Sequence, residues 1–199
     1  MFLINALKKY RLILTHLVKN RVKRAQLFAL GFRAHSSTSV AWTVSADGGG
    51  KGGRIVVGKD TRLDIGVVLR AYGGFISIGN HCSLNPYCVL HGKGGIRIGN
   101  GVRIASHTVI VASNHNFEDP AVFIHKQGIS AAGIIIEDDV WIGAGARILD
   151  GVTVRRGSVV GAGAVVTHST NVGAVVAGVP ARQIRSRHPL ESQRLRPHS

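Results

Sequence analysis

Residues 134–166 read IIIEDDVWIGAGARILDGVTVRRGSVVGAGAVV, and this stretch decides the fold. From Ile136 to Val166, every sixth residue is aliphatic. The same spacing runs back toward the N-terminus in blocks of three, and the full set is Val57, Leu63, Leu69, Ile78, Leu84, Leu90, Ile98, Ile104, Ile110, Ile136, Ile142, Ile148, Val154, Val160 and Val166. A period of six excludes an amphipathic helix, whose apolar face recurs every three or four residues.

The period predicts short strands joined by tight turns. Three six-residue units close one triangular coil, and successive coils stack at the strand spacing of about 4.8 Å. Four residues after nearly every aliphatic the chain is small or β-branched, with Asn114 as the misfit. The expected fold is therefore all-β, a parallel β-helix with large aliphatic side chains inside. Cys82 and Cys88 fall on the small inward positions, so the two cysteines need neither a disulfide framework nor a zinc motif.

One gap in the repeat predicts a long loop. Ile98 and Ile136 open the third and fourth blocks and lie 38 residues apart rather than 18. The extra residues, 112–133, are expected to leave the prism as one loop. Loops of this length in a compact repeat are usually functional.

The charge of this 199-residue chain is concentrated at its ends. Lys and Arg total 25 against 10 acidic residues, a formal charge of +15. Residues 1–35 and 182–199 hold 12 of these net charges, which favours anionic partners. We expect three parts: a basic helical segment (1–35), the β-helix (36–184) and a basic tail (185–199). The sequence contains no run of 18 uncharged apolar residues and no convincing signal peptide, so we expect a cytoplasmic location. Within it, the inner face of the cell membrane is an open alternative to the bulk cytoplasm.

The N-terminal segment has its own pattern. Leu3, Leu7, Tyr10, Leu14 and Leu17 recur at spacings of three and four, with basic residues between them, which predicts an amphipathic α-helix. Two roles stay open for it. It caps the open end of the β-helix, or residues 1–30 contact an anionic membrane surface. Nucleic-acid binding is not expected, because aromatic residues are not interleaved with the basic ones.

Three motifs carry a family resemblance: Val140-Trp141-Ile142-Gly143, the VGAGAVVT run at 160–167, and AGVPAR at 177–182. With the repeats, they resemble the hexapeptide-repeat acyltransferases over about 55–184. Within that family they are similar to the galactoside and maltose acetyltransferases and to the enzymes that acetylate lipopolysaccharide and capsular sugars. The resemblance implies a left-handed β-helix, a homotrimer with active sites between subunits, acetyl-CoA as donor and no metal.

His115 opens the long loop, in the sequence SNHNFEDP. In the resembled family a histidine at this place is the catalytic base. A sugar hydroxyl is a poor nucleophile and must lose its proton as it attacks a thioester, and imidazole accepts a proton near neutral pH. The alternative is a solvated loop histidine. Glu118 or Asp119 could orient the imidazole, or both are surface acids.

The resemblance also implies binding residues. Asn85 and Asn114 are candidates for contacting the acceptor, and Asn85 has the alternative role of a turn residue. The pantetheine arm of the donor is expected beside small residues of the last coils, with Trp141 as a wall and arginines for the phosphates. These candidates are Trp141, Gly143, Ala144, Gly161, Ala162, Gly163, Thr167, Arg182 and Arg185. The chain departs from many relatives in having His168 where they have lysine.

A zinc site of the γ-type carbonic anhydrases would use three histidines on a similar prism. His81, His91 and His107 are available, but their positions on different hexads argue against metal binding.

The predicted function is O-acetyl transfer from acetyl-CoA to a saccharide hydroxyl, by direct attack in a ternary complex. The alternatives are another acceptor (an amino sugar, serine or an antibiotic) and a non-catalytic β-helix scaffold.

Overall fold

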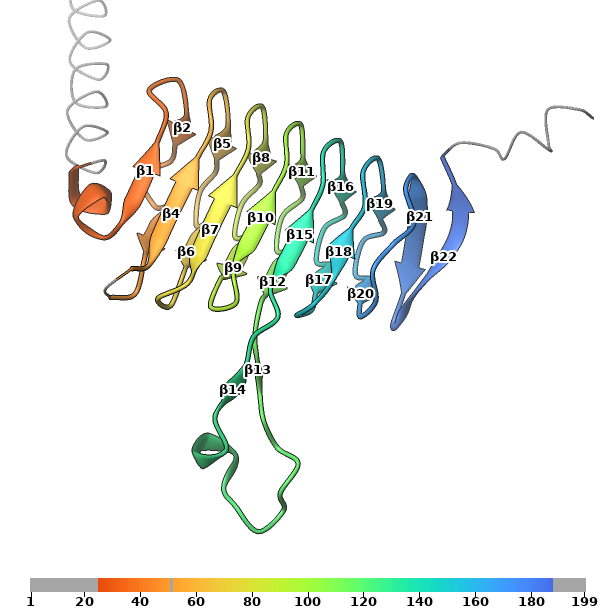
Figure 1. Ribbon diagram of the computed structural model, residues 1–199. Helices are drawn as coiled ribbons and strands as arrows, with labels where there is room; N and C mark the ends of the chain where they lie inside the picture. Colours follow the sequence, from red (N-terminus) through yellow and green to blue (C-terminus); the bar gives the residue numbers. More distant parts are fainter. Residues whose placement is uncertain (1–24, 51, 188–199) are drawn as a thin grey trace, which may run out of the picture.

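The computed structural model describes residues 25–50 and 52–187 as a β-helix of three parallel sheets (Figure 1). We call the sheets faces A, B and C. Each coil contributes one strand to each face in turn, and strands of successive coils pair in parallel. The faces meet at three edges. The AB edge holds the turns after the strands of face A, the BC edge those after face B, and the CA edge those after face C.

The strands of the three faces are short. Face A contains β1 (Phe32–Ala34), β4 (Arg54–Val57), β7 (Phe75–Ile78), β10 (Ile96–Ile98), β15 (Ile134–Ile136) and β18 (Thr153–Val154). Face B contains β2 (Ser39–Val40), β5 (Arg62–Leu63), β8 (Ser83–Leu84), β11 (Arg103–Ile104), β16 (Trp141–Ile142), β19 (Val159–Val160), β21 (Ala174–Gly178) and β22 (Ala181–Ser186). Face C contains β3 (Ser45–Asp47), β6 (Val68–Arg70), β9 (Val89–His91), β12 (Val109–Val111), β17 (Arg147–Ile148) and β20 (Val165–Val166).

The predicted core is confirmed. All fifteen aliphatic residues of the six-residue period are buried. They stand in columns because the register of the coils is exact to the residue: Leu84 pairs with Leu63 on one side and with Ile104 on the other. Apolar burial over three such columns is the main stabilising term of the fold.

The structure has one coil more than the period identified. Strands β1, β2 and β3 place Ala34, Val40 and Ala46 in register with Val57, Leu63 and Leu69. These residues keep the six-residue spacing, but two are alanines, so a search for large aliphatics does not find them. The β-helix consequently begins at Phe32, before the expected boundary at residue 36. Residues 25–29 are helical, and the rest of the expected amphipathic helix lies outside the described residues.

The C-terminal end differs from the repeat. Strand β22 pairs with β21 in antiparallel orientation and is the last strand of face B. Arg185 is therefore part of a strand, whereas the tail was expected to begin there. Residues 188–199 lie outside the described part. In the described residues, no helix is long and apolar enough to cross a membrane.

The loop expected at residues 112–133 lies between β12 and β15. It projects from the CA edge as a long hairpin (Figure 1). The strands β13 (Asn114–His115) and β14 (Ile129–Ser130) pair at its base, and a 3-10 helix, η1 (Ile124–Lys126), lies further out. Its return to the prism is fixed by Asp150, whose carboxylate accepts the N–H groups of Ala132 (2.9 Å) and Gly133 (2.8 Å).

Both cysteines occupy the interior, as expected. Cys82 and Cys88 are free thiols with buried side chains. Burial raises the pKa of Cys82, and it raises the pKa of Cys88 to about 11, so both remain protonated near neutral pH.

Neighbouring isoleucines of β15 provide a test of the core. Ile136 is 1% exposed and lies between Ile98 and Val154, whereas the side chain of Ile135 is 43% exposed. We expect Ile136→Ala to lower the free energy of unfolding by about 2–5 kcal/mol and Ile135→Ala by less than about 1 kcal/mol. Urea denaturation measures both, and equal losses would contradict the inward assignment.

Alkylation tests the thiols. A pKa raised from 9 to about 11 lowers the thiolate fraction of Cys88 roughly a hundredfold at pH 8. Iodoacetamide should therefore label the native protein very slowly and the urea-unfolded protein at the rate of a free thiol. Fast labelling of native protein would show that these positions open to solvent.

Candidate functional site

The BC edge gathers most of the residues predicted to bind substrates. Because the strands of face B are in register, the residues that follow them form one line across the coils. That line is Asn85, Ala105, Gly143, Gly161 and Ala177. Arg182 pairs with Ala177 and therefore stands at its C-terminal end. Trp141 flanks the line on face B, with its side chain 55% exposed.

On the C-terminal half of this edge, two exposed residues have backbone N–H groups with no acceptor among the described residues. The N–H groups of Gly143, Gly161 and Gly163 donate to Val160, Val176 and Ala144 respectively, each at 2.8 Å, and so hold the coils together. Between them stand Ala144 and Ala162, both exposed, whose N–H groups form no protein hydrogen bond in this part of the chain. Of the five small residues expected beside the donor, only these two alanines therefore keep a backbone N–H that is not used within the described chain.

The glycines of the BC edge differ in how much space surrounds them. A Cβ on Gly143 would lie 2.5 Å from the nitrogen of Ala162, so this glycine is needed for coils to stack. Gly163 has a φ of +67°, and a Cβ there would meet no atom within 4 Å. The edge is therefore open at Gly163.

The N-terminal half of the same edge carries rings that the sequence analysis did not assign to this site. Tyr87 and His107 occupy the corner position that is glycine at 66, 145 and 163, and both have positive φ (62° and 61°). Their rings stack at 5.3 Å with an interplanar angle of 16°. Only the corner register, which the structure supplies, identifies them as neighbours of Asn85.

Asn85 has a defined partner in this chain. Its side-chain carbonyl oxygen accepts a hydrogen bond from the Arg62 guanidinium at 3.1 Å, across one coil. Its side chain is half-buried, at the turn between faces B and C. Its place is compatible both with the turn role and with contact to a ligand on the edge.

Arg182 lines a hollow of about 360 Å³ at the C-terminal end of the prism. His168, the residue that replaces the relatives' lysine, lines the same hollow. Its Nδ1 lies 2.8 Å from the hydroxyl of Thr167, which does not itself line the hollow. Arg185 is exposed on β22 and does not line the hollow, so the two candidate arginines are separated.

His115 and Asn114 lie at the base of the extruded hairpin, and both are exposed. His115 pairs with Ile129 and Asn114 with Ser130, so the antiparallel ladder fixes their backbone. Further out, the Gln127 side chain donates hydrogen bonds to the carbonyls of Asp119 (2.8 Å) and Val122 (2.7 Å). The loop is an ordered arm and not an open connection.

The acids of the loop do not orient the histidine in the described chain. The carboxylate of Asp119 accepts the N–H of Ala121 at 2.9 Å, which stabilises the turn. Glu118 forms no hydrogen bond or ion pair with His115 in this part of the structure. The positions of Glu118 and Asp119 therefore fit better with the alternative that both are surface acids.

Within one chain the catalytic candidate and the binding edge do not meet. His115 belongs to the CA edge, whereas Asn85 and the line from Gly143 to Ala177 belong to the BC edge. Face C lies between the two edges. A site that uses both needs a second subunit.

The three histidines considered for zinc lie on different edges. His81 is at the AB edge, His107 at the BC edge and His91 at the end of β9 beside the CA edge. Burial, with a smaller effect of Arg70, lowers the pKa of His91. No group of three or more His, Cys, Asp or Glu in residues 25–50 and 52–187 is placed to hold a metal ion.

Comparisons with known proteins agree with this architecture. A family model described as the hexapeptide repeat of succinyl-transferase matches residues 133–168. A 56-residue segment is 59% identical to 2,3,4,5-tetrahydropyridine-2,6-dicarboxylate N-acetyltransferase from Staphylococcus aureus. This segment spans 28% of the chain and only 23% of that enzyme.

Solved structures match over most of the chain. AntD, an N-acyltransferase from Bacillus cereus, superposes with a TM-score of 0.71 at 26% identity, covering 86% of this chain and 95% of AntD; that structure holds dTDP-4-amino-4,6-dideoxyglucose and coenzyme A. Another AntD structure, with dTDP and 3-hydroxybutyryl-CoA, gives 0.70 at 25% identity, covering 83% and 88%. A hexapeptide transferase family protein from Anaplasma phagocytophilum gives 0.55 at 21%, covering 79% and 84%, and shows the fold alone. The expected left-handed hexapeptide β-helix is confirmed.

Proposed function

Because the chain belongs to the hexapeptide-repeat family of left-handed β-helix acyltransferases, we propose that it transfers an acyl group from acyl-CoA to a sugar. The observation that carries the proposal is the BC edge: free N–H groups at Ala144 and Ala162, an open corner at Gly163, and Arg182 at the end. A pantetheine arm is a chain of amides that can accept such N–H groups. The structures of AntD with coenzyme A and with an acyl-CoA support this donor.

We propose a homotrimer, with the site between subunits. The outward residues of face C form one row, in which four are half-buried valines: Val68, Val89, Val109 and Val165. Ser45 and the exposed Arg147 belong to the same row, so its continuous apolar part is Val68, Val89 and Val109. These β-branched residues suit contact with a second copy. Packing face C of each chain near a three-fold axis brings the CA edge of one chain beside the BC edge of the next. His115 would then reach the BC edge of the neighbouring chain, where the donor is proposed to bind.

The chemistry follows from this arrangement. His115 takes a proton from the nitrogen or oxygen atom of the acceptor as that atom bonds to the carbonyl carbon of the thioester. The tetrahedral oxyanion is met by an N–H of the edge, for which Ala144 and Ala162 are the candidates. The carbon–sulfur bond then breaks, and the imidazolium returns its proton to the CoA thiolate. The ternary complex needs no covalent enzyme intermediate.

The acceptor atom that the relatives favour differs from the one predicted from the sequence. The resemblance led us to a sugar hydroxyl, whereas the relatives named above are N-acyltransferases, one of them bound to an amino sugar. We propose the amine of a nucleotide-linked amino sugar as acceptor, with the hydroxyl of a saccharide as the second candidate. We keep acetyl, the donor acyl group expected from the sequence, for either acceptor. The use of acyl-CoA supports a cytoplasmic location.

The bond formed distinguishes the two acceptors. Wild-type protein is incubated with acetyl-CoA and a panel of amino sugars, sugar nucleotides and neutral saccharides, with release of the CoA thiol as readout. We expect turnover on an amino sugar and a product that resists hydroxylamine, because amides survive it and esters do not. A hydroxylamine-sensitive product would establish O-acylation instead. No thiol release with any acceptor, together with no acetyl-CoA binding, would favour a scaffold.

Replacing His115 tests the base. We expect His115→Ala to lower kcat about 10²- to 10⁴-fold, the usual contribution of general base catalysis, while acetyl-CoA binds as before. The matched control is His125→Ala on the same loop, where the ring stacks on Phe123 at 5.8 Å. Full turnover by the His115 variant would remove this residue from the mechanism.

A substitution at Gly163 tests whether the donor binds along the BC edge. A tryptophan at 163 would fill the open corner, so we expect Gly163→Trp to lose acetyl-CoA binding in calorimetric titration. Gly101→Trp is the control, because Gly101 has nearly the same φ (+68°) and equally open space but lies on the AB edge. If both variants bind acetyl-CoA like the wild type, the donor does not lie along the BC edge.

A further inference from the structure

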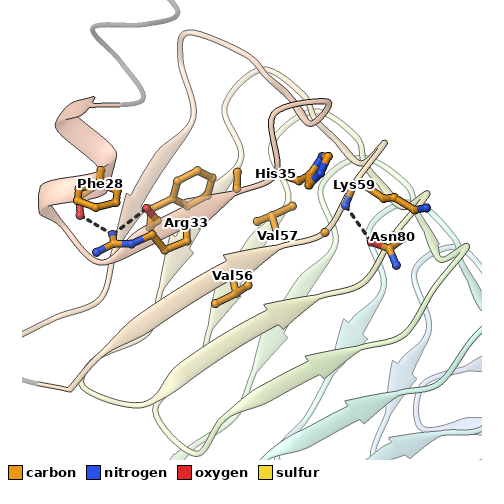
Figure 2. Close-up of a pocket in the computed structure, with 10 residues that line it drawn as sticks. Phe28, Arg33, His35, Val56, Val57, Lys59 and Asn80 are labelled. Atoms are coloured by element: carbon orange, nitrogen blue, oxygen red, sulfur yellow. Dashed lines mark hydrogen bonds between the residues drawn. The ribbon is translucent and has the colours of Figure 1, made fainter.

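A second hollow lies at the N-terminal end of the prism, away from the proposed active site. It measures about 490 Å³ and is formed by the first coils on face A. Its apolar surface comes from Phe28, Phe32, Val56 and Val57, and cationic side chains of Arg33 and Lys59 stand around it (Figure 2). Phe28 is 57% exposed and Val56 43% exposed, so the apolar surface is accessible from outside.

At the hollow the chain holds the guanidinium of Arg33 and the backbone of Lys59 in place. The Arg33 guanidinium donates to the carbonyls of Phe28 (2.8 Å) and Phe32 (3.2 Å) and lies 3.4 Å above the Phe28 ring. The N–H of Lys59 donates to the Asn80 side chain at 2.9 Å, while its ammonium group is exposed (Figure 2). One acid is close in sequence, Asp60, and its carboxylate faces His81 at 3.7 Å.

The surroundings of the hollow are basic and partly apolar. Strands β1, β4, β7 and β10 of face A contain no acidic residue. Their outward side chains include Arg54 and Arg97, which lie 5.7 Å and 4.8 Å from the Phe75 ring centre. The chain that leads into this end, residues 1–24, carries seven Lys and Arg and no acid.

We propose that this end of the prism docks on a bilayer that contains anionic phospholipid. The lipid phosphates would lie at Arg33 and Lys59, and an acyl chain or glycerol backbone would cover Phe28 and Val56. A free inorganic anion would use the cations but leave the apolar surface uncovered, whereas a lipid matches both. This proposal is independent of the acyl-transfer reaction.

Vesicle flotation of the full chain tests it. We expect binding to vesicles of phosphatidylcholine mixed with phosphatidylglycerol, little binding to phosphatidylcholine alone, and weaker binding as salt rises. Arg33→Gln with Lys59→Gln should weaken binding to the anionic vesicles roughly 25-fold, since each cation contributes about fivefold. Lys59→Gln alone, whose ammonium is exposed, should cost about fivefold and keeps the test valid if the double variant does not fold. The matched control is Lys93→Gln, an exposed lysine of the CA edge, which should bind like the wild type.

Two results would overturn the proposal. The first is no preference for anionic vesicles. The second is unchanged binding of the Lys59 and double variants, which would assign any membrane contact to residues 1–24 alone. Val56→Ser distinguishes lipid binding from a purely electrostatic effect. This variant should weaken the vesicle binding that remains at high salt. If vesicle binding at high salt is unchanged, no lipid chain occupies the hollow.

Discussion

The register of the coils is the constraint on which the rest of the structure depends. Each inward aliphatic must lie directly above its counterpart in the coil below, as Leu84 lies between Leu63 and Ile104. A slip of one residue would turn the whole inward set to solvent. Because the interior is fixed in this way, the corner residues are also placed in fixed lines along the three edges.

These lines explain where chemistry can be located. A corner residue contributes little to the interior, so the same place on the BC edge is occupied by rings at Tyr87 and His107 and by glycine at Gly163 without a change in the core columns. The edge thus combines ring stacking, free N–H groups and open space in adjacent coils. The long loop also leaves the prism at a corner, and hydrogen bonds to Asp150 fix the point where it returns.

The sequence predicts the interior well and the surface less well. The period of six identifies the buried columns, the inward place of Cys88 and the loop at 112–133, because burial requires those residue types. It overlooks the first coil, where Ala34 and Ala46 satisfy the register with small side chains. It also does not show which small residues of the BC edge keep a free N–H, because the use of an N–H between coils depends on the turn conformation. Finally, spacing alone does not show that His115 and Asn85 lie on different edges.

We propose that two subunits complete the active site, with the His115 loop from one chain and the BC edge from the next. The most direct measurement mixes His115→Ala and Gly163→Trp chains, each alone inactive, after joint unfolding and refolding, and follows CoA thiol release. A shared site predicts that activity returns, because a mixed interface pairs an intact His115 with an intact BC edge. A mixture as inactive as its parents, although shown by mass spectrometry to contain mixed oligomers, would contradict the shared site.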